Sequence, residues 1–305
     1  MIEHRLYDER AGELGPYYVL FDRIEDAGHV DKNGVYVSDI DDGPLATLEF
    51  GLDQHERWTR TRNLRARHLF LMQANWAAQA QVNVAGVRGS YPFPSACHTF
   101  GCNPGYRSAT AQSEAISLLL RAYEETHNEL YLERAKDASI PLTADLRDGG
   151  VAWQDGDDLF FEHKAGLVPS HVLSGWICSL WGLLELSRMA KLPHIEALYA
   201  QSLATLEKYL PCYDTGSWSY ESLLAAPSGF RRFSNLRCHL LHVAQLDVLL
   251  SMTKNELFSV VAERWRRYVA STESRIRLLV NAAAAIPNAI ISNELTVPGG
   301  ARSIV

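Results

Sequence analysis

Apolar residues recur every three or four positions over most of the chain after residue 60, which is the spacing of one face of an α-helix. Leu173, Ile177, Leu180 and Leu184 form one such stripe. The pattern predicts seven or eight helices, over residues 64–85, 109–126, 129–144, 171–191, 196–210, 235–252, 256–270 and 273–285.

The first 60 residues follow a different pattern. Residues 16–50 alternate apolar and polar positions in short stretches that glycine and aspartate interrupt. The segment 31–34, Asp-Lys-Asn-Gly, is a strong turn signal and precedes the apolar segment 35–37. We therefore predict a small β-hairpin in this part of the chain.

The connections between the predicted helices alternate in length. The short links fall near residues 127, 193 and 254, and the long ones cover residues 86–107, 145–170 and 211–234. In an array of antiparallel helices, this alternation brings every long loop to the same end, and long loops in compact domains usually carry function. We predict a mainly α fold, an α/α barrel (toroid) of antiparallel helix pairs with a functional site at the loop-bearing end.

This interpretation divides the chain into three parts. Residues 1–60 are expected to form an N-terminal segment whose β-hairpin packs on the barrel, and residues 61–285 the barrel itself. Residues 286–305 contain prolines and a Gly-Gly pair, which predict an irregular tail.

Composition and charge indicate which kinds of binding partner and which cellular compartment to expect. The chain has 305 residues, 47% of them hydrophobic, and a formal net charge of −7, which argues against nucleic acid or anionic membranes as partners. No apolar run reaches the roughly 18–20 residues of a membrane-spanning helix. The first ten residues are too charged for a secretory signal, and five cysteines without CxxC spacing indicate free thiols in a reducing compartment. We expect a cytoplasmic protein.

The first long loop ends in a candidate anion-binding residue. Arg107 directly precedes a predicted helix, where its guanidinium and the helix amides both favour a carboxylate. The alternative is an ordinary surface arginine. Gln112 lies one turn further along that helix and either points into the barrel or caps a neighbouring group.

The other two long loops lead to further candidates. Glu162 follows two phenylalanines, and desolvation there would raise the carboxyl pKa as a general acid or base requires; the alternative is a half-exposed carboxylate at a loop edge. His239 and His242 share one face of a predicted helix. They have neither the HExxH pattern nor a third ligand, so we expect no zinc site. The alternative is that one histidine packs in the core and the other bonds a loop carbonyl.

The chain contains four ordered blocks, which read SATAQSEAISLLLRAY at 108–123, VLSGWICSLWGL at 172–183, YDTGS at 213–217 and HLLHVAQL at 239–246. In sequence, order and spacing they resemble the catalytic domain of the glucuronyl C5-epimerases of heparan sulfate and heparosan. The resemblance extends from about residue 16 to residue 270.

The resemblance implies an α/α-barrel fold and inversion at C5 of a hexuronate, from D-glucuronate to L-iduronate within a polysaccharide. A base removes the proton alpha to the carboxylate on one face of the carbon, an acid returns a proton on the other, and charge neutralisation at the carboxylate assists both steps. This chemistry requires no redox cofactor, and we expect neither a cofactor nor a metal.

The resemblance also assigns residues. Tyr220 matches one tyrosine of the family's site and Glu162 its glutamate, whereas His163 and Cys238 stand where the family has two other tyrosines. Histidine and cysteine carry protons with pKa values nearer neutrality than tyrosine, so we assign the acid and base roles to these four residues. We assign substrate binding to Arg107, Tyr106, Gln112, Asp214, His239 and His242.

Three alternatives stay open. The carbon acid is an amino-acid or peptide α-carbon in the first, since cysteine and histidine also suit that chemistry. The second is a non-catalytic domain that binds carbohydrate or peptide. The third is a lyase, which begins with the same proton abstraction and ends in β-elimination. A homodimer is left open as well.

Overall fold

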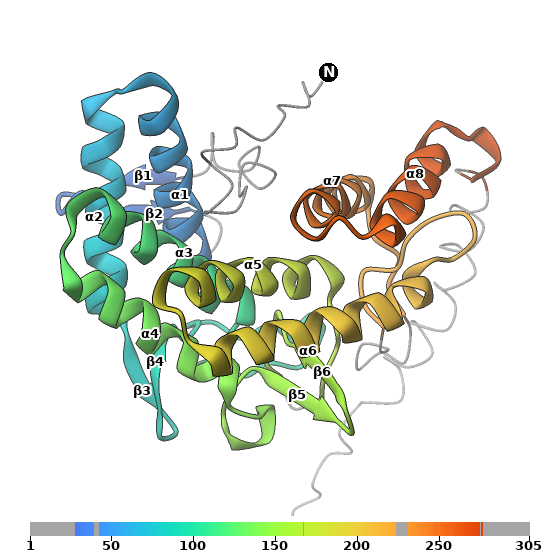
Figure 1. Ribbon diagram of the computed structural model, residues 1–305, viewed down its shortest axis with the longest axis horizontal. Helices are drawn as coiled ribbons and strands as arrows, with labels where there is room; N and C mark the ends of the chain where they lie inside the picture. The colour runs from blue at the N-terminus through green and yellow to red at the C-terminus, as the bar shows by residue number, and fades with distance from the viewer. Residues whose placement is uncertain (1–27, 40–42, 167, 224–230, 275, 277–305) are drawn as a thin grey trace, which may run out of the picture.

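The computed structural model describes residues 28–39, 43–166, 168–223, 231–274 and 276 (Figure 1). Helices dominate this part of the chain, as predicted. They are α1 (Pro44–Thr61), α2 (Leu64–Ala80), α3 (Ala109–Thr126), α4 (Glu129–Thr143), α5 (Leu173–Ala190), α6 (Pro193–Tyr209), α7 (Leu236–Thr253) and α8 (Glu256–Ala270).

The helices form consecutive pairs. α1 packs against α2, α3 against α4, α5 against α6 and α7 against α8. The odd-numbered helices also pack on one another in succession, from α1 through α3 and α5 to α7. Figure 1 shows the pairs following an arc from α1 and α2 to α7 and α8. Two layers of helices result, an inner one of odd-numbered and an outer one of even-numbered helices, as in an α/α barrel.

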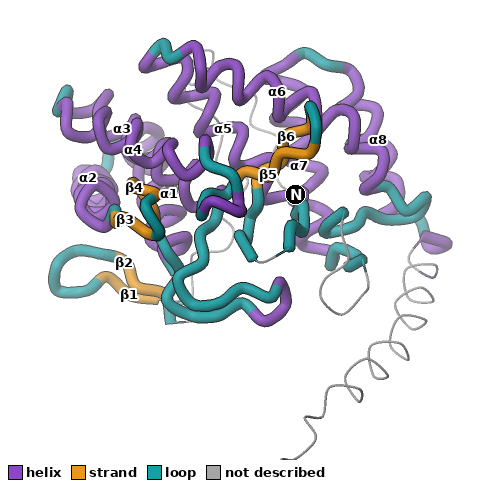
Figure 2. Tube along the Cα trace, turned by 90° about the horizontal axis from the view of Figure 1, so that it is seen from below, coloured by secondary structure: helices purple, strands orange, loops and turns teal. Residues whose placement is uncertain are grey.

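Three short antiparallel hairpins accompany the helices (Figure 2). They are β1 (Gly28–Val30) with β2 (Tyr36–Ser38), β3 (Val82–Val84) with β4 (Val87–Ser90), and β5 (Ala152–Asp155) with β6 (Asp158–Phe161). The first confirms the predicted hairpin, and Asp31 Oδ1 stabilises its turn by accepting the N–H groups of Asn33 and Val35 at 2.8 and 2.9 Å. The other two lie within the long loops, where the sequence pattern predicts no strand.

The expectation that helices begin after residue 60 is wrong, because α1 starts at Pro44. Its buried face is narrow and centres on Leu48 and Leu52. Gly51 lies between them, where a Cβ would come within 2.9 Å of Leu118 in α3. The domain division at residue 60 stays a prediction, as do the tail 286–305 and most of the helix expected over 273–285, which lie outside the described residues.

Helices α3 and α5 are the core of the array. Every residue from Ala109 to Ala122 is buried. The two helices approach closely at Gly182, whose N–H donates to Ser113 Oγ at 2.9 Å and where a Cβ would lie 2.4 Å from that oxygen. Arg121 of α3 and Glu185 of α5 form an enclosed ion pair at 2.9 Å. This rigid pair carries the starts of both helices, which lie at the loop-bearing end.

The short links between paired helices repeat one local design. Segments 61–63, 126–128 and 253–255 each read Thr-x-Asn, and the middle residue of each is in the left-handed region, with φ of 55, 54 and 59°. The threonine hydroxyl accepts the asparagine N–H at 3.2–3.3 Å, and the asparagine side chain caps the next helix. These turns satisfy their own backbone groups, so they need no partner elsewhere in the chain.

Candidate active site

The three long connections meet at one end of the helices, as predicted. They cover residues 81–108 (the first long loop), 144–172 (the second) and 210–235 (the third). The N–H of Ala165 in the second loop donates to the carbonyl of Arg107 in the first, at 2.9 Å. The N–H of Leu173, where α5 begins, donates to the carbonyl of Glu221 in the third loop, at 3.0 Å. The starts of α3, α5 and α7 therefore share one loop cluster.

Arg107 lies next to Ser108, the N-cap of α3, and is half-buried. Its Nη1 donates to the carbonyl of Val84 at 3.4 Å, whereas its buried Nε has no hydrogen-bond partner within the described part of the chain. Burial lowers the pKa of its guanidinium, which is the direction expected for a cation without a nearby anion. The environment fits the predicted carboxylate clamp; substrate binding by Arg107 stays a prediction.

A second cation, Lys164, lies over aromatic rings of the first loop. Its Nζ is 5.7 Å from the ring centroid of Phe93 and 5.6 Å from that of Tyr106. These two rings stack with centroids 4.7 Å apart, and Lys164 donates to the Tyr106 hydroxyl at 3.4 Å. The buried Tyr106, predicted to bind substrate, thus anchors an aromatic stack that positions a positive charge.

Tyr220 lies in the third loop with a third cation on its ring. The Arg231 guanidinium carbon is 4.0 Å from the ring centroid, and the Phe233 ring packs 5.1 Å away. Arg231 Nη2 donates to the carbonyl of Cys212 at 2.7 Å, and its buried Nε is unpaired among the described residues. Tyr220 is half-buried, and no hydrogen bond of its hydroxyl occurs within the described ranges. The Arg231 guanidinium therefore lies directly against the Tyr220 ring as a cation–π contact.

Cys238 lies in the first turn of α7, where Asn235 caps the helix. Its Sγ is 3.4 Å from Nε2 of His242, one turn further along. His242 is fully buried, and its Nδ1 lies 3.1 Å from Ser219 Oγ in the third loop. A half-buried thiol and a buried imidazole are thereby joined at the loop-bearing end.

Hydrogen bonds join the Trp265 carbonyl, His239, Ser219, His242 and Cys238 in that order, and they fix the tautomers of both histidines. Nε2 of His239 lies 3.0 Å from the Trp265 carbonyl, which can only accept, so this nitrogen carries the proton. Nδ1 of the neutral ring then accepts from the Ser219 hydroxyl at 2.8 Å. Because that hydroxyl has one hydrogen, its oxygen accepts from Nδ1 of His242. Nε2 of His242 is left with a lone pair, and the Cys238 thiol donates to it.

Burial keeps these imidazoles neutral. It lowers the pKa of His239 and, together with the nearby His239, lowers that of His242 to about 3. A neutral imidazole with a lone pair at Nε2 accepts a hydrogen bond from the thiol. This hydrogen bond directs the Cys238 S–H toward His242.

His163 lies where α3, α5 and α7 meet. Its Nδ1 lies 2.7 Å from Thr110 Oγ1 in the first turn of α3, and its side chain lies over Gly175 of α5, where a Cβ would be 2.3 Å from its own. Gln245 of α7 donates to the carbonyl of Ser174, the residue before that glycine, at 2.9 Å. The face of α7 that carries Cys238 and His242 thus packs on the same turn of α5 as His163.

Glu162 lies beneath the loops. It is fully buried, and its carboxylate accepts the backbone N–H and the hydroxyl of Ser170, at 2.8 and 2.9 Å. The ring of His171 lies 2.6 Å from the same carboxylate. The expected burial of Glu162 is confirmed. Its contacts with Ser170 and His171 stabilise the conformation of the second loop, and its catalytic role stays a prediction.

Gln112 and Asp214 also make contacts inside the protein. The Gln112 amide oxygen accepts the N–H of Tyr91 at 2.9 Å, and its nitrogen donates to the carbonyls of Gly89 and Ala138, each at 2.8 Å. Asp214 accepts the Tyr268 hydroxyl at 3.0 Å and pairs with an arginine of α8. Both side chains brace a long loop against a helix; their predicted binding roles are not tested by these contacts.

Lys164, Arg231 and Ser219 are not among the residues that the sequence predicts. The two cations do carry a signal, because each stands within two residues of His163 or Phe233 in a long loop. Ser219 stands directly before Tyr220, but its link to the two histidines carries no sequence signal, since they lie 20 and 23 positions away.

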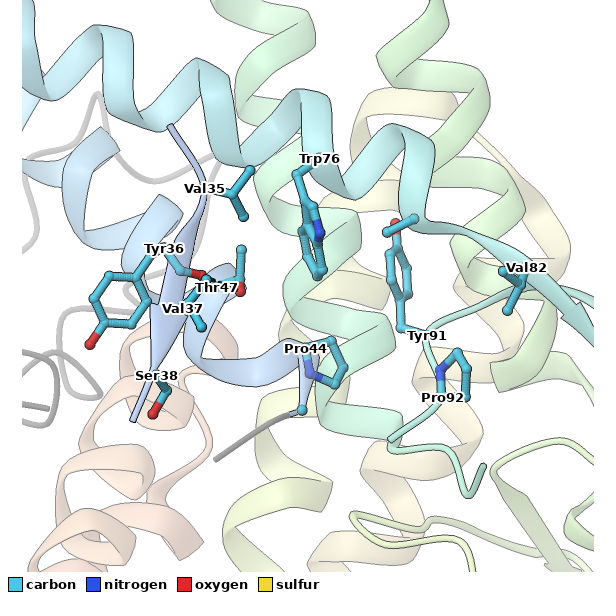
Figure 3. Close-up of a pocket in the computed structure, with 12 residues that line it drawn as sticks. Val35, Tyr36, Val37, Ser38, Pro44, Thr47, Trp76, Val82, Tyr91 and Pro92 are labelled. Carbon is cyan, nitrogen blue, oxygen red and sulfur yellow. Dashed lines mark hydrogen bonds between the residues drawn. The ribbon is translucent and has the colours of Figure 1, made fainter. Parts of the chain in front are cut away.

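A separate groove of about 300 Å³ runs between the β1–β2 hairpin, α2 and the first long loop (Figure 3). Trp76 and Tyr91 form its aromatic wall, with ring centroids 6.4 Å apart, and Pro44 and Pro92 lie nearby. None of the predicted site residues lines it. The groove therefore offers apolar surface, but it contains none of the predicted acid or base residues.

The searches for metal ligands and membrane helices cover the described residues alone. No group of three or more His, Cys, Asp and Glu side chains in these ranges is placed to hold a metal ion. No helix in them has both the length and the apolar character to cross a membrane.

The paired inner and outer helices, with a polar site where the long loops meet, define an α/α-barrel protein. Solved structures agree. D-mannose isomerase superposes with a TM-score of 0.52 at 14% identity, covering 79% of this chain and 64% of its own. The unsaturated glucuronyl hydrolase of Bacillus sp. GL1 gives 0.50 at 15%, covering 76% and 62%. At these identities the likeness shows the fold, and it confirms the predicted α/α barrel.

The chain belongs to the family described as D-glucuronyl C5-epimerase C-terminus, which matches residues 84–267. The D-glucuronyl C5-epimerase of Caenorhabditis elegans is 29% identical over 214 residues, which cover 66% of this chain and 35% of that protein. An uncharacterised protein of Methanocaldococcus jannaschii is 27% identical over 183 residues, 59% of this chain and 56% of that one. The chain thus spans about a third and just over half of the lengths of these two relatives.

Proposed function

We propose that the chain is an epimerase that inverts C5 of a hexuronate in a saccharide by direct proton transfer, without a cofactor. The observation that carries this proposal is the pair of proton carriers at the loop-bearing end. Cys238 Sγ lies 3.4 Å from Nε2 of the buried His242, and the Tyr220 ring lies beside the cation of Arg231. Inversion needs one proton carrier on each face of the carbon, and we assign these two residues to that task.

The distribution of charge supports an anionic substrate. The chain carries a net charge of −7, yet Arg107, Lys164 and Arg231 form no ion pair with a carboxylate within the described residues. All three lie in the long loops. A uronate carboxylate would be held by such cations, and the same cations would stabilise the negative charge that develops on it. We assign the clamp to Arg107, whose planar fork matches a carboxylate.

The proton balance of the reaction is simple. Tyr220, as the phenolate, takes the C5 proton, and the electron pair left on carbon delocalises into the uronate carboxylate. Cys238 delivers its proton to the opposite face of C5 and becomes a thiolate. Exchange with solvent restores both groups, and the reverse reaction exchanges their roles. His163, fixed by Thr110 and Gly175, is the next candidate for either face.

A heavy-water experiment tests this function. The full chain is incubated with heparosan or glucuronate oligosaccharides in deuterium oxide, and C5 is followed by NMR. We expect deuterium at C5 and the appearance of the L-ido epimer. Cys212→Ser serves as the matched control for Cys238→Ser, because Cys212 is exposed in the third loop, which leads into α7.

The other outcomes separate the alternatives. Ultraviolet absorbance of an unsaturated uronate would identify a lyase. Deuterium at the α-carbon of a peptide would show that the substrate is a peptide and not a uronate saccharide. A saccharide that binds without any C–H exchange would contradict the proposed epimerase and leave a binding domain.

A further inference from the structure

Two cysteines of the first long loop face each other across a tight turn. Cys97 and Cys102 form an isolated antiparallel bridge, in which the Cys97 N–H donates to the Cys102 carbonyl at 2.9 Å and the Cys102 N–H donates back at 3.0 Å. A single 3-10 turn, His98–Phe100, joins them, and Gly101 closes it with φ of 65°. Their backbones are therefore held in register by two hydrogen bonds.

This pairing matches the geometry that a disulfide needs. Residues that exchange both backbone hydrogen bonds have Cα atoms about 5.5 Å apart and side chains on the same face. Disulfides join Cα atoms roughly 4.4–6.8 Å apart. We propose that Cys97 and Cys102 are a reversible dithiol–disulfide pair. Their Cβ atoms, about 4.5–5.5 Å apart in such a bridge, must move closer to reach the roughly 3.5–4.5 Å of a disulfide, so the bond would be strained and readily reduced.

The two thiols have different environments, which sets the order of the steps. Cys97 is half-buried, whereas Cys102 is 3% exposed and burial raises its pKa to about 12. The Cys97 thiolate attacks a small disulfide such as oxidised glutathione, forms a mixed disulfide and releases one thiol. The Cys102 thiolate then attacks the Cys97 sulfur and releases the second thiol. The protein dithiol is oxidised, and the small disulfide is reduced to two thiols.

The pair lies where the first loop meets the second. A Cβ at Gly166 would be 3.2 Å from Cys102 Sγ and 2.7 Å from the carbonyl of Phe100. Tyr106, four residues after Cys102, supports Lys164, and Arg107 follows it. The disulfide would therefore fix the turn that supports two of the three loop cations. Its formation does not depend on the proposed substrate.

The test uses the full chain, equilibrated with mixtures of reduced and oxidised glutathione and then trapped with N-ethylmaleimide. Trypsin cleavage after Arg88 and Arg107 releases both cysteines in one peptide, residues 89–107. We expect this peptide to be unlabelled and two hydrogen atoms lighter, while the exposed Cys212 carries maleimide or glutathione. Because closure needs the Cys102 thiolate, its rate should rise about tenfold per pH unit over the neutral to mildly alkaline range.

Two variants provide controls. Cys102→Ser should stop at the mixed disulfide on Cys97, and Cys97→Ser should leave Cys102 unmodified in the folded protein. The proposal is overturned if Cys97 of the wild-type peptide carries maleimide, or accumulates a mixed disulfide, under the oxidant that modifies Cys212. Circular dichroism before trapping confirms that each sample is folded, and the wild-type result decides the question even if a variant does not fold.

Discussion

The two ends of the helix array use positive charge in different ways. At the short-link end, three of the four left-handed residues that close the helices are exposed cations, namely Arg62, Lys191 and Lys254. They lie at helix C-termini, where a cation complements the helix dipole. At the loop-bearing end, Arg107 and Arg231 are half-buried, each with an unpaired buried Nε in the described structure. The first set serves the fold, and the second is available to an anion.

Substitutions in the core that both ends share should cause the largest losses of unfolding free energy. Leu180 is fully buried in α5, so Leu180→Ala should lower the free energy of unfolding by about 2–5 kcal/mol through the cavity that it leaves. Leu240→Ala is the matched control, because Leu240 is 44% exposed, and it should cost less than about 0.5 kcal/mol. Denaturant titration measures both. Equal costs would mean that the assigned faces of these helices are wrong.

Arg107→Lys sharpens the comparison at the loop-bearing end. It keeps the charge but removes the bidentate fork, so kcat/KM for a uronate saccharide should fall about tenfold or more, equivalent to about 1.4 kcal/mol. Arg62→Lys makes the same change at the short-link end and should leave kcat/KM unaltered. An Arg107→Ala variant with wild-type kcat/KM would refute the clamp.

The buried His242 predicts how stability depends on pH. Its pKa of about 3 in the folded protein lies below the ordinary value of 6.5, so the unfolded chain binds more protons between these values. The free energy of unfolding should therefore fall as pH decreases through this window, by about 1.4 kcal/mol per pH unit near pH 5 from this residue. Denaturation of wild type and His242→Gln at pH 7 and pH 5 measures the contribution. If both lose the same stability, His242 is not the buried neutral group described above.

Asn128→Ala breaks a turn at the short-link end. Its side chain accepts the N–H of Leu130 at 3.1 Å, and loss of this N-cap should cost about 1 kcal/mol of unfolding free energy. Asn128→Ser retains an acceptor and should stay close to wild type. Neither change should alter kcat/KM, since the turn is built from local contacts. A large loss of activity with intact stability would show that the two ends are not independent.

The helices could largely be predicted from the sequence. The expected helices 109–126 and 256–270 coincide with α3 and α8, because each has a continuous apolar stripe and a capping residue, Ser108 or Asn255, before it. α1 was missed because its apolar face is short and contains Gly51. The helix expected over 64–85 ends at Ala80, since its last residues pair as a strand instead.

Both hairpins within the long loops carry turn signals in the sequence. Ala85 and Gly86 have φ of 54 and 86° and form a two-residue turn between valines. The Gly-Asp pair at 156–157 forms the two-residue β5–β6 turn, with Asp155 paired to Asp158. Turn chemistry is local and can be read from sequence, whereas the length of a strand depends on its partner.

The candidate site was predictable only in part. The loops and most of the chemical groups in them follow from the sequence, because polar side chains gather between helices. The hydrogen-bond chain through Ser219 does not, since it joins a loop to α7 and α8 through tertiary packing. The enclosure of Glu162 by Ser170 and His171 likewise depends on how the second loop folds back.

The central claim is that Tyr220 and Cys238 carry protons to opposite faces of one carbon. Deuterium incorporation by Tyr220→Phe and Cys238→Ser, each starting from either C5 epimer in heavy water, tests it most directly. Both variants should lose epimerisation, and one of them should still exchange the C5 hydrogen with retention, from one epimer only. The account is contradicted if Cys238→Ser epimerises at the wild-type rate and the Cys238 thiol of the wild-type protein resists alkylation with and without substrate.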